Sequence, residues 1–190
     1  MLLGALLCMG ACAEPPNKEM NQAQGAIDTA RAAGADRYAT DEYGAAVAAL
    51  EKSRKAVEEG GYRQALSYAL DARERAQVAA RTASDEKARL HSTSDRTLHV
   101  AELALDRSKT ALEHADAAKV PAREIAAQRA AVVEADRAVR DARSAIERDD
   151  FEAGIKRLAG LPARLETITS EIDAAALAHA VKRPARRSRR

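Results

Sequence analysis

Aromatic, glycine and proline residues are scarce in this 190-residue chain, and their scarcity excludes most folds built on a sheet. The aromatic residues are four tyrosines and one phenylalanine, without tryptophan, and there are nine glycines and five prolines. So few turn formers cannot separate many short strands, and so few large apolar side chains cannot fill a sandwich or a doubly wound sheet. Alanine supplies 47 residues, more than half of the hydrophobic ones. This composition is typical of long α-helices.

The chain also lacks a long apolar run and a large net charge. No stretch of about 20 residues is apolar enough to predict a membrane-spanning helix. The formal charge of +2 is unevenly distributed, because six of the 31 basic residues lie in the last nine positions. The other 25 basic residues face 29 acidic ones, so a mildly acidic body carries a cationic tail. The tail residues are Lys182, Arg183, Arg186, Arg187, Arg189 and Arg190.

Both cysteines lie near the amino terminus, in the run MLLGALLCMGAC. The apolar stretch followed by Gly10 and Ala11 before Cys12 resembles the end of a bacterial lipoprotein signal peptide, in which small residues precede the cysteine that is lipidated. Cys8 fits less well, because Leu7 precedes it. The alternative is an apolar helix end, which Pro15 and the proline after it disfavour because neither continues a helix.

A processed chain would begin at Cys12, whose lipid chains would anchor it to a membrane. Cys8 would be removed, so the mature body would hold no free thiol and no disulfide. Ala13 differs from the aspartate that retains enterobacterial lipoproteins in the inner membrane. The resemblance therefore implies the periplasmic face of the outer membrane.

Large and small residues alternate in heptads along the predicted helices. A large apolar residue recurs every seven positions, with a small residue three positions later in most heptads, which is the pattern of helices packed closely in a bundle or coiled coil. We therefore predict an all-α fold of antiparallel helical hairpins or a bundle with long, alanine-rich helices, and helix packing that could also support oligomers. The series are Tyr43–Leu50–Val57 with Ala46 and Ser53, Leu98–Leu105–Leu112 with Ala101, Ser108 and Ala115, Val132–Val139–Ile146 with Ala135 and Ala142, and Leu158–Leu165–Ile172 with Leu161, Ile168 and Ala175.

Glycine and proline residues mark the expected breaks between helices. Gly34, Gly60 with Gly61, Pro121 and Gly160 to Pro162 interrupt the helices. Residues 62–120 contain neither glycine nor proline, so they form one long helix or are interrupted only at residues 92–95, where Ser94 could cap a second helix. We predict a signal peptide (1–11), a linker (12–20), helical-hairpin modules (21–90 and 91–180) and a disordered basic tail (181–190).

The two modules resemble each other at an offset of 89 residues. Leu50 falls on Val139, and Gly60 with Gly61 falls on Asp149 with Asp150. Tyr62 then falls on Phe151, so an aromatic residue follows the turn in each module and would close the end of the hairpin. This shared register predicts a tandem duplication.

Residues 35–43 (ADRYATDEY) and 60–66 (GGYRQAL) resemble a bacterial lipoprotein family, domain of unknown function 4398. Its members have a similar Tyr-Ala-x-x-Glu-Tyr start and a Gly-x-Tyr-x-x-Ala motif that opens the next helix. The resemblance covers about residues 20–90 and implies a periplasmic helical lipoprotein without a known activity. All four tyrosines lie in this window, and we take them as the candidate partner-binding residues: Tyr38, Tyr43, Tyr62 and Tyr68.

The sequence offers no pattern for catalysis, a cofactor or a metal. The four histidines form no i,i+4 pair and no His-Glu-x-x-His motif, so zinc binding has no local support. Asp149 and Asp150 are predicted to form a turn, and the sequence suggests no partner that would make them a carboxylate pair for acid–base catalysis. No phosphate-binding loop follows Gly60 and Gly61. We therefore expect a protein that is not an enzyme and needs no cofactor.

The basic tail is the remaining functional signal. It could bind a polyanion such as lipopolysaccharide phosphates, peptidoglycan carboxylates or nucleic acid, or it could be a solubilising end without a partner. The favoured function is a lipid-anchored periplasmic scaffold, spacer or interaction module at the outer membrane, bound to an envelope protein or polymer. The alternative is a cytoplasmic helical protein that binds nucleic acid through the tail, which the acidic body disfavours.

Overall fold

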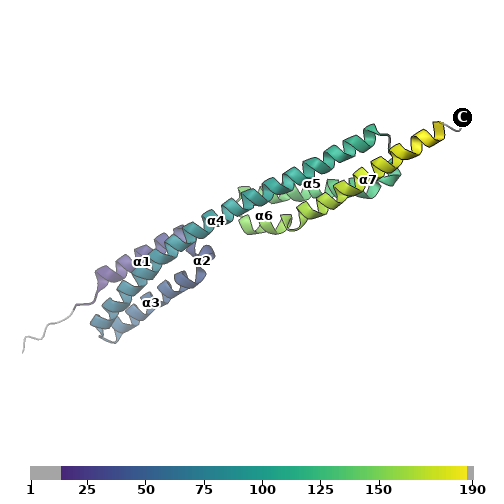
Figure 1. The fold of residues 1–190 in the computed structure, drawn as a ribbon. Helices are drawn as coiled ribbons and strands as arrows, with labels where there is room; N and C mark the ends of the chain where they lie inside the picture. The colour runs from purple at the N-terminus through teal and green to yellow at the C-terminus, as the bar shows by residue number, and fades with distance from the viewer. Residues whose placement is uncertain (1–13, 188–190) are drawn as a thin grey trace, which may run out of the picture. The chain divides into compact units, whose positions relative to one another are not determined.

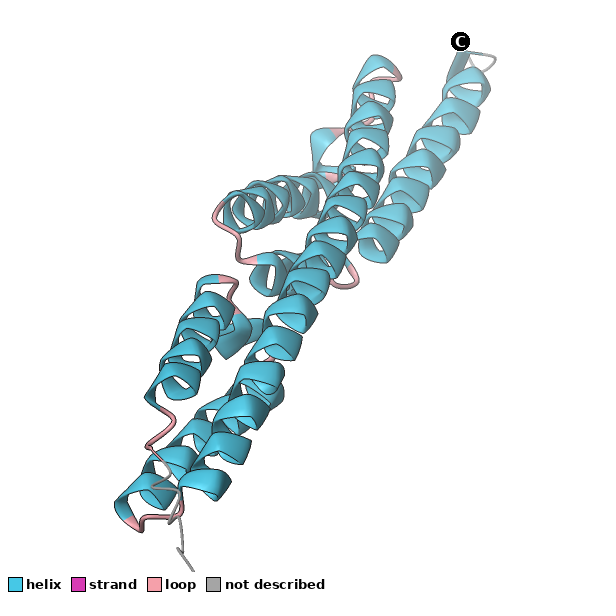
Figure 2. Cartoon of the chain, turned by 90° about the vertical axis from the view of Figure 1, so that its left-hand side faces the viewer, coloured by secondary structure: helices cyan, strands magenta, loops and turns pink. Residues whose placement is uncertain are grey.

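The computed structural model describes residues 14–187, with side chains as far as residue 181, and every regular element in that range is helical (Figures 1 and 2). The predicted all-α fold is confirmed. No described helix combines the length and the apolar character that crossing a bilayer requires. The elements are α1 (Asn17–Ala32), α2 (Ala35–Tyr38), α3 (Thr40–Glu58), α4 (Tyr62–Ala117), the 3₁₀ turn η1 (Ala122–Glu124), α5 (Ala126–Glu147), α6 (Phe151–Leu158) and α7 (Leu161–Arg187).

The chain forms two compact units, which divide between Ala88 and Arg89, two residues from the boundary that the sequence predicts. The division falls inside α4, which is one continuous helix. Residues 92–95 therefore do not interrupt it. The hydroxyl of Ser94 donates to the carbonyl of His91 (2.8 Å) and that of Thr93 to the carbonyl of Arg89 (2.8 Å). Such bonds satisfy Ser and Thr within a helix, so no cap is needed.

Unit 1 packs α1, α3 and the first part of α4 around a core made mostly of alanine. Hydrogen bonds between the helices show their directions. Arg54, near the end of α3, reaches Gln24 on α1 (2.8 Å), and Ser53 on α3 donates to the carbonyl of Ala65 at the start of α4 (2.7 Å). Hence α3 runs antiparallel to both α1 and α4. Methyl-sized side chains let these helices approach closely, as the heptads predict. The buried residues are Ala23, Ile27, Ala30, Ala35, Ala39, Ala46, Ala49, Leu50, Ala72, Ala76, Ala79 and Ala83.

Unit 2 packs the rest of α4, α5 and the pair α6–α7 around a core with larger side chains. The buried serine Ser108 on α4 bonds the carbonyl of Leu165 (3.3 Å) and the hydroxyl of Thr169 (2.8 Å) on α7. Each unit thus holds three long helices and a short one, α2 or α6, where the sequence predicts a hairpin of two, because α1 and α7 each add an apolar face. Large buried residues of this unit are Leu105, Leu112, Ile125, Val132, Val139, Phe151, Leu158, Leu165, Ile168 and Ile172.

The turns at residues 56–65 and 145–154 have the same geometry at an offset of 89. Gly60 and Asp149 both adopt positive φ (75° and 61°). Gly61 N–H donates to the carbonyl of Ala56 (2.8 Å), and Asp150 N–H donates to that of Ala145 (2.9 Å). These are the 6→1 bonds of Schellman caps. The two turns that the sequence repeat aligns thus share one helix cap, which α4 also has at its end, where Val120 N–H donates to the carbonyl of Ala115 (3.0 Å).

The ends of the helical region differ from the predicted boundaries. α1 begins at Asn17, inside the predicted linker, because Pro16 can precede a first turn and Glu19 suits its positive end. α7 continues to Arg187, so the backbone of residues 181–187 is helical instead of disordered. Arginine and alanine favour helix, whereas a proline at position 184 disfavours it.

Candidate functional site

The structure describes no side chains for two sets of predicted site residues, the lipidation site and the basic tail. Cys12 lies among residues 1–13, outside the described range. Arg189 and Arg190 also lie outside it. The backbone of the other four basic residues belongs to α7, but side chains beyond residue 181 lie outside the description: Lys182, Arg183, Arg186 and Arg187. Lipidation and polyanion binding therefore rest on the sequence.

The four tyrosines lie in two groups near opposite ends of α3. Tyr38 ends α2 and Tyr43 lies in the first turn of α3, whereas Tyr62 begins α4 just after α3 ends. Tyr68 lies two turns further along α4. Since α3 has 19 residues, its ends are about 28 Å apart. All four side chains are half-buried. The fold does not gather them into one surface but forms two tyrosine-containing ends of unit 1.

At the first of these ends, arginines hold both tyrosines. The Arg31 Nε–H donates to the Tyr43 hydroxyl (2.7 Å), and its guanidinium lies 5.7 Å from the centre of that ring. The Arg37 guanidinium lies 5.2 Å from the ring of Tyr38. Contacts of this kind contribute about 0.5–1 kcal/mol each at exposed sites. This end therefore presents aromatic and cationic groups side by side.

At the other end the tyrosines are less restrained. The Gln64 side chain donates to the Tyr68 hydroxyl (3.1 Å) along one face of α4. Leu66 and Leu70 follow Tyr62 at intervals of four residues and remain 37% and 40% exposed. Residues four apart lie on one flank of a helix, so Tyr62, Leu66 and Leu70 form an apolar strip.

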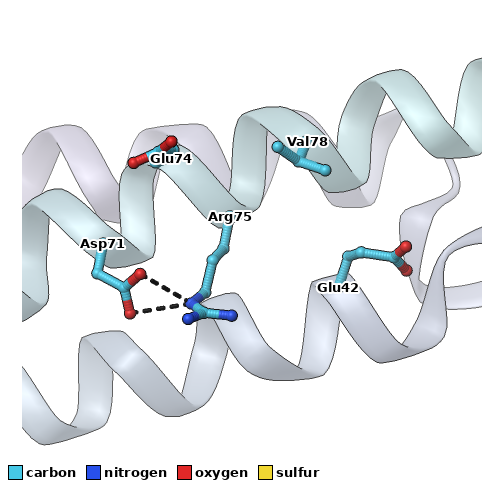
Figure 3. Close-up of a pocket in the computed structure, with 5 residues that line it drawn as sticks. All are labelled: Glu42, Asp71, Glu74, Arg75 and Val78. Atoms are coloured by element: carbon cyan, nitrogen blue, oxygen red, sulfur yellow. Dashed lines mark hydrogen bonds and ion pairs between the residues drawn. The ribbon is translucent and has the colours of Figure 1, made fainter.

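A groove of about 310 Å³ lies between α3 and α4 in unit 1 (Figure 3). Glu42 extends into it from α3, and Asp71, Glu74, Arg75 and Val78 line it from α4. Both carboxylate oxygens of Asp71 accept from Arg75 Nε at 2.9 Å. This hydrogen bond and the charge of Asp71 raise the pKa of Arg75 above its ordinary value. Arg75 is thus already paired, which leaves the groove with a net negative charge.

The sequence analysis missed this groove. The i,i+4 spacing of Asp71 and Arg75 was a signal that the two would pair on a helix. The position of Glu42 opposite them could not be inferred, because it depends on how α3 packs against α4.

Charged side chains in unit 2 join neighbouring helices. Lys109 on α4 reaches Asp136 on α5 (2.7 Å), and Arg143 on α5 reaches Glu102 on α4 (2.6 Å). The hydrogen bond from Lys109 lowers the pKa of the Asp136 carboxyl, and the bond to Glu102 raises the pKa of Arg143. These four charged side chains are therefore paired with each other between α4 and α5.

Grooves in unit 2 follow the seams between helices. One of about 360 Å³ lies between α5 and α7, where Gln128 donates to Glu171 (2.8 Å). Arg164 lines the same groove and pairs with Glu134 at 3.3 Å. Both pairs cross from α5 to α7, so polar groups at this groove hold the helices together.

The histidines within residues 14–187 are not gathered into a metal site. His91 lies beside Asp95 (3.2 Å) and packs edge-on against Phe151, with ring centres 5.2 Å apart. No group of three His, Cys, Asp or Glu residues in the described part of the chain could hold a metal ion. His91 thus has a packing role at the start of α6.

Residues 18–94 match the family model described as Domain of unknown function (DUF4398). The match confirms the resemblance that the tyrosine motifs indicate. It covers α1 to α3 and the first part of α4, which include unit 1 almost entirely. No curated protein and no solved structure matches the chain.

Proposed function

We propose that this protein, whose residues 18–94 form a domain of the DUF4398 family, is a lipid-anchored periplasmic protein that acts as a non-catalytic scaffold or spacer at the outer membrane. The observation that carries the proposal is the Gly10-Ala11-Cys12 sequence, which follows an apolar stretch and precedes the helical body by four residues. Small residues before a cysteine suit lipoprotein processing, and several acyl chains on one residue anchor firmly.

A scaffold role fits the way in which the helix seams use their polar groups. Arg75 in the first groove is bonded to Asp71, and Arg164 is paired across its seam with Glu134. A catalytic site needs a nucleophile or base aimed at a substrate, held near an orienting partner. The charges that line these grooves are paired instead, within α4 for Arg75 and between α5 and α7 for Arg164, and the outer faces remain for partners.

The proposed partner surface is the arginine-held end of unit 1. Tyr38 and Tyr43 present half-buried rings that Arg31 and Arg37 hold in place. Aromatic and arginine side chains dominate protein interfaces, and an ordered side chain loses little entropy on binding. We assign this end to an envelope protein and the basic residues 182–190 to a polyanion of the envelope.

The test is labelling of growing cells with radioactive palmitate, followed by separation of membranes from soluble proteins. The wild-type protein and a Cys8→Ala variant should carry label and sediment with the outer membrane. Cys12→Ala should carry none. An unlabelled wild-type protein in the soluble cytosolic fraction would refute the proposal. Salt-dependent retention of that protein on nucleic acid would then favour the alternative function of the tail.

A further inference from the structure

We propose that the apolar strip of Tyr62, Leu66 and Leu70 rests on the lipid surface to which Cys12 is anchored. This inference depends on the proposed lipid anchor and adds an orientation: the α3–α4 turn of unit 1 faces the membrane. Four observations support it: the position of the strip, its exposure, the cover over the counterpart of Tyr62 in unit 2, and the length of the connection to Cys12.

The strip lies beside the start of α1. Arg73 on α4 donates to Gln22 on α1 (2.8 Å), and both helices run antiparallel to α3, so they run parallel to each other. Asn17 lies five residues before Gln22, so it is level with Tyr68. Tyr62 and Leu66 therefore lie at the same end of unit 1 as the beginning of the described chain (Figure 1).

The strip is exposed although it is on the flank of α4 that faces α1. α1 cannot extend over it as a helix, because Pro16 and the proline before it lack the N–H groups that a longer helix needs. Leu66 and Leu70 stay more than a third exposed. With the half-buried ring of Tyr62 they form a small apolar surface on this flank.

Unit 2 provides a comparison for Tyr62 only, because the counterparts of Leu66 and Leu70 are the half-buried Ile155 and the exposed Ala159. At the offset of 89, Tyr62 corresponds to Phe151, which is only 1% exposed. The ring of His91, near the beginning of unit 2 on α4, packs on Phe151. Tyr62, by contrast, is only half-buried.

The short connection to Cys12 keeps the strip close to the membrane surface. Four residues lie between Cys12 and Asn17, so the five steps of an extended chain span at most about 3.6 Å each, or roughly 18 Å in all. Tyrosine and leucine suit such a position, since a tyrosine ring places its apolar body in lipid and its hydroxyl in water.

Charges around the turn indicate an apolar contact. Glu58 and Glu59 end α3, while Lys55 and Arg63 lie on either side of them in sequence, so the local charges balance. A contact without net charge is insensitive to salt, whereas binding by the basic tail falls as salt rises. Salt therefore distinguishes this contact from tail binding.

The experiment uses single tryptophans as reporters, because the natural chain has none. Leu66→Trp reports on the strip, and Val78→Trp is the matched control, since Val78 is on the same helix with equal exposure (38%) but lies in the groove. Leu70→Trp is a second reporter if the first disturbs folding. Each chain begins at Cys12, contains every described residue and is coupled through Cys12 to a maleimide lipid. The vesicles contain phosphatidylethanolamine and phosphatidylglycerol with brominated acyl chains, which quench tryptophan.

The strip reporter should lose at least about twice the fraction of fluorescence that Val78→Trp loses, because an interfacial helix face enters the lipid by roughly 5–10 Å. The difference should persist at high salt. Equal quenching of the two reporters, or a difference that vanishes with salt, would overturn the inference. The coupling is chemical, so this result does not depend on acylation in cells. Absence of palmitate would refute the proposed function alone.

Discussion

Replacing Gly154 with alanine tests how closely α6 approaches α5. An added Cβ at Gly154 would lie 2.6 Å from Ile146 Cγ1 and 3.4 Å from the Ala142 carbonyl oxygen. Ordinary carbon–carbon contacts are about 3.5–4.0 Å, so Ile146 must move by about an ångström. Overpacking of this kind costs about 1–3 kcal/mol, and alanine recovers up to about 1 kcal/mol as a better helix former. We expect Gly154→Ala to lower the free energy of unfolding by about 1–2 kcal/mol.

Gly44→Ala is the matched control, because Gly44 is also within a helix but an added Cβ would meet nothing within 4 Å. The same substitution should therefore stabilise the protein by about 0.5–1 kcal/mol. Urea unfolding followed by far-UV circular dichroism measures both changes. The double variant Gly154→Ala with Ile146→Ala should lose less stability than the sum of its two single changes. A Gly154→Ala protein as stable as Gly44→Ala would refute the close approach.

Three further predictions concern charge, the core and the tail. The pKa of Asp136 is lowered by Lys109 in the fold, so its stabilisation is present above the ordinary pKa of about 3.9 and is lost as the pH falls through the lowered value. Asp136→Asn should cost under about 1 kcal/mol at neutral pH, and a cost that does not shrink as the pH falls below about 3.9 in urea unfolding would contradict this. Phe151→Ala should cost about 3–5 kcal/mol, far more than Tyr62→Ala, and equal costs in urea titrations would contradict the difference in their burial. Deleting residues 182–190 should abolish binding to purified lipopolysaccharide or peptidoglycan. The melting temperature should not fall, since the last fully buried residue in the described part of α7 is Ile172. A lower melting temperature would show that the tail is structural.

The fold could be predicted well where a backbone conformation or a close contact admits only one kind of residue. Gly34, Gly60 and Gly160 adopt positive φ at the predicted breaks, where glycine has no Cβ to clash. The small heptad residues Ala46, Ser53 and Ser108 are buried, as close helix packing requires.

Other features depend on neighbours that the sequence does not place. Lys119 and Asp149 also adopt positive φ, which their residue types do not predict. Ser94 caps nothing, because the helix supplies an acceptor four residues or fewer behind it. The third helix of each unit and the groove at Glu42 follow from tertiary packing, which the heptads alone leave open.

The two repeats diverge most at their openings, and this difference links the fold to the proposed orientation. Phe151 is covered by α4, whereas Tyr62 lies beside a chain that leaves α1 at Pro16. A duplicated module can therefore keep its turn geometry while its first copy uses the uncovered strip for another contact.

The most direct test of the lipid anchor is the intact mass of the protein purified from cell membranes. The account predicts a chain that lacks residues 1–11 and carries acyl chains on Cys12. A mass that equals the full 190-residue chain without any modification would contradict it.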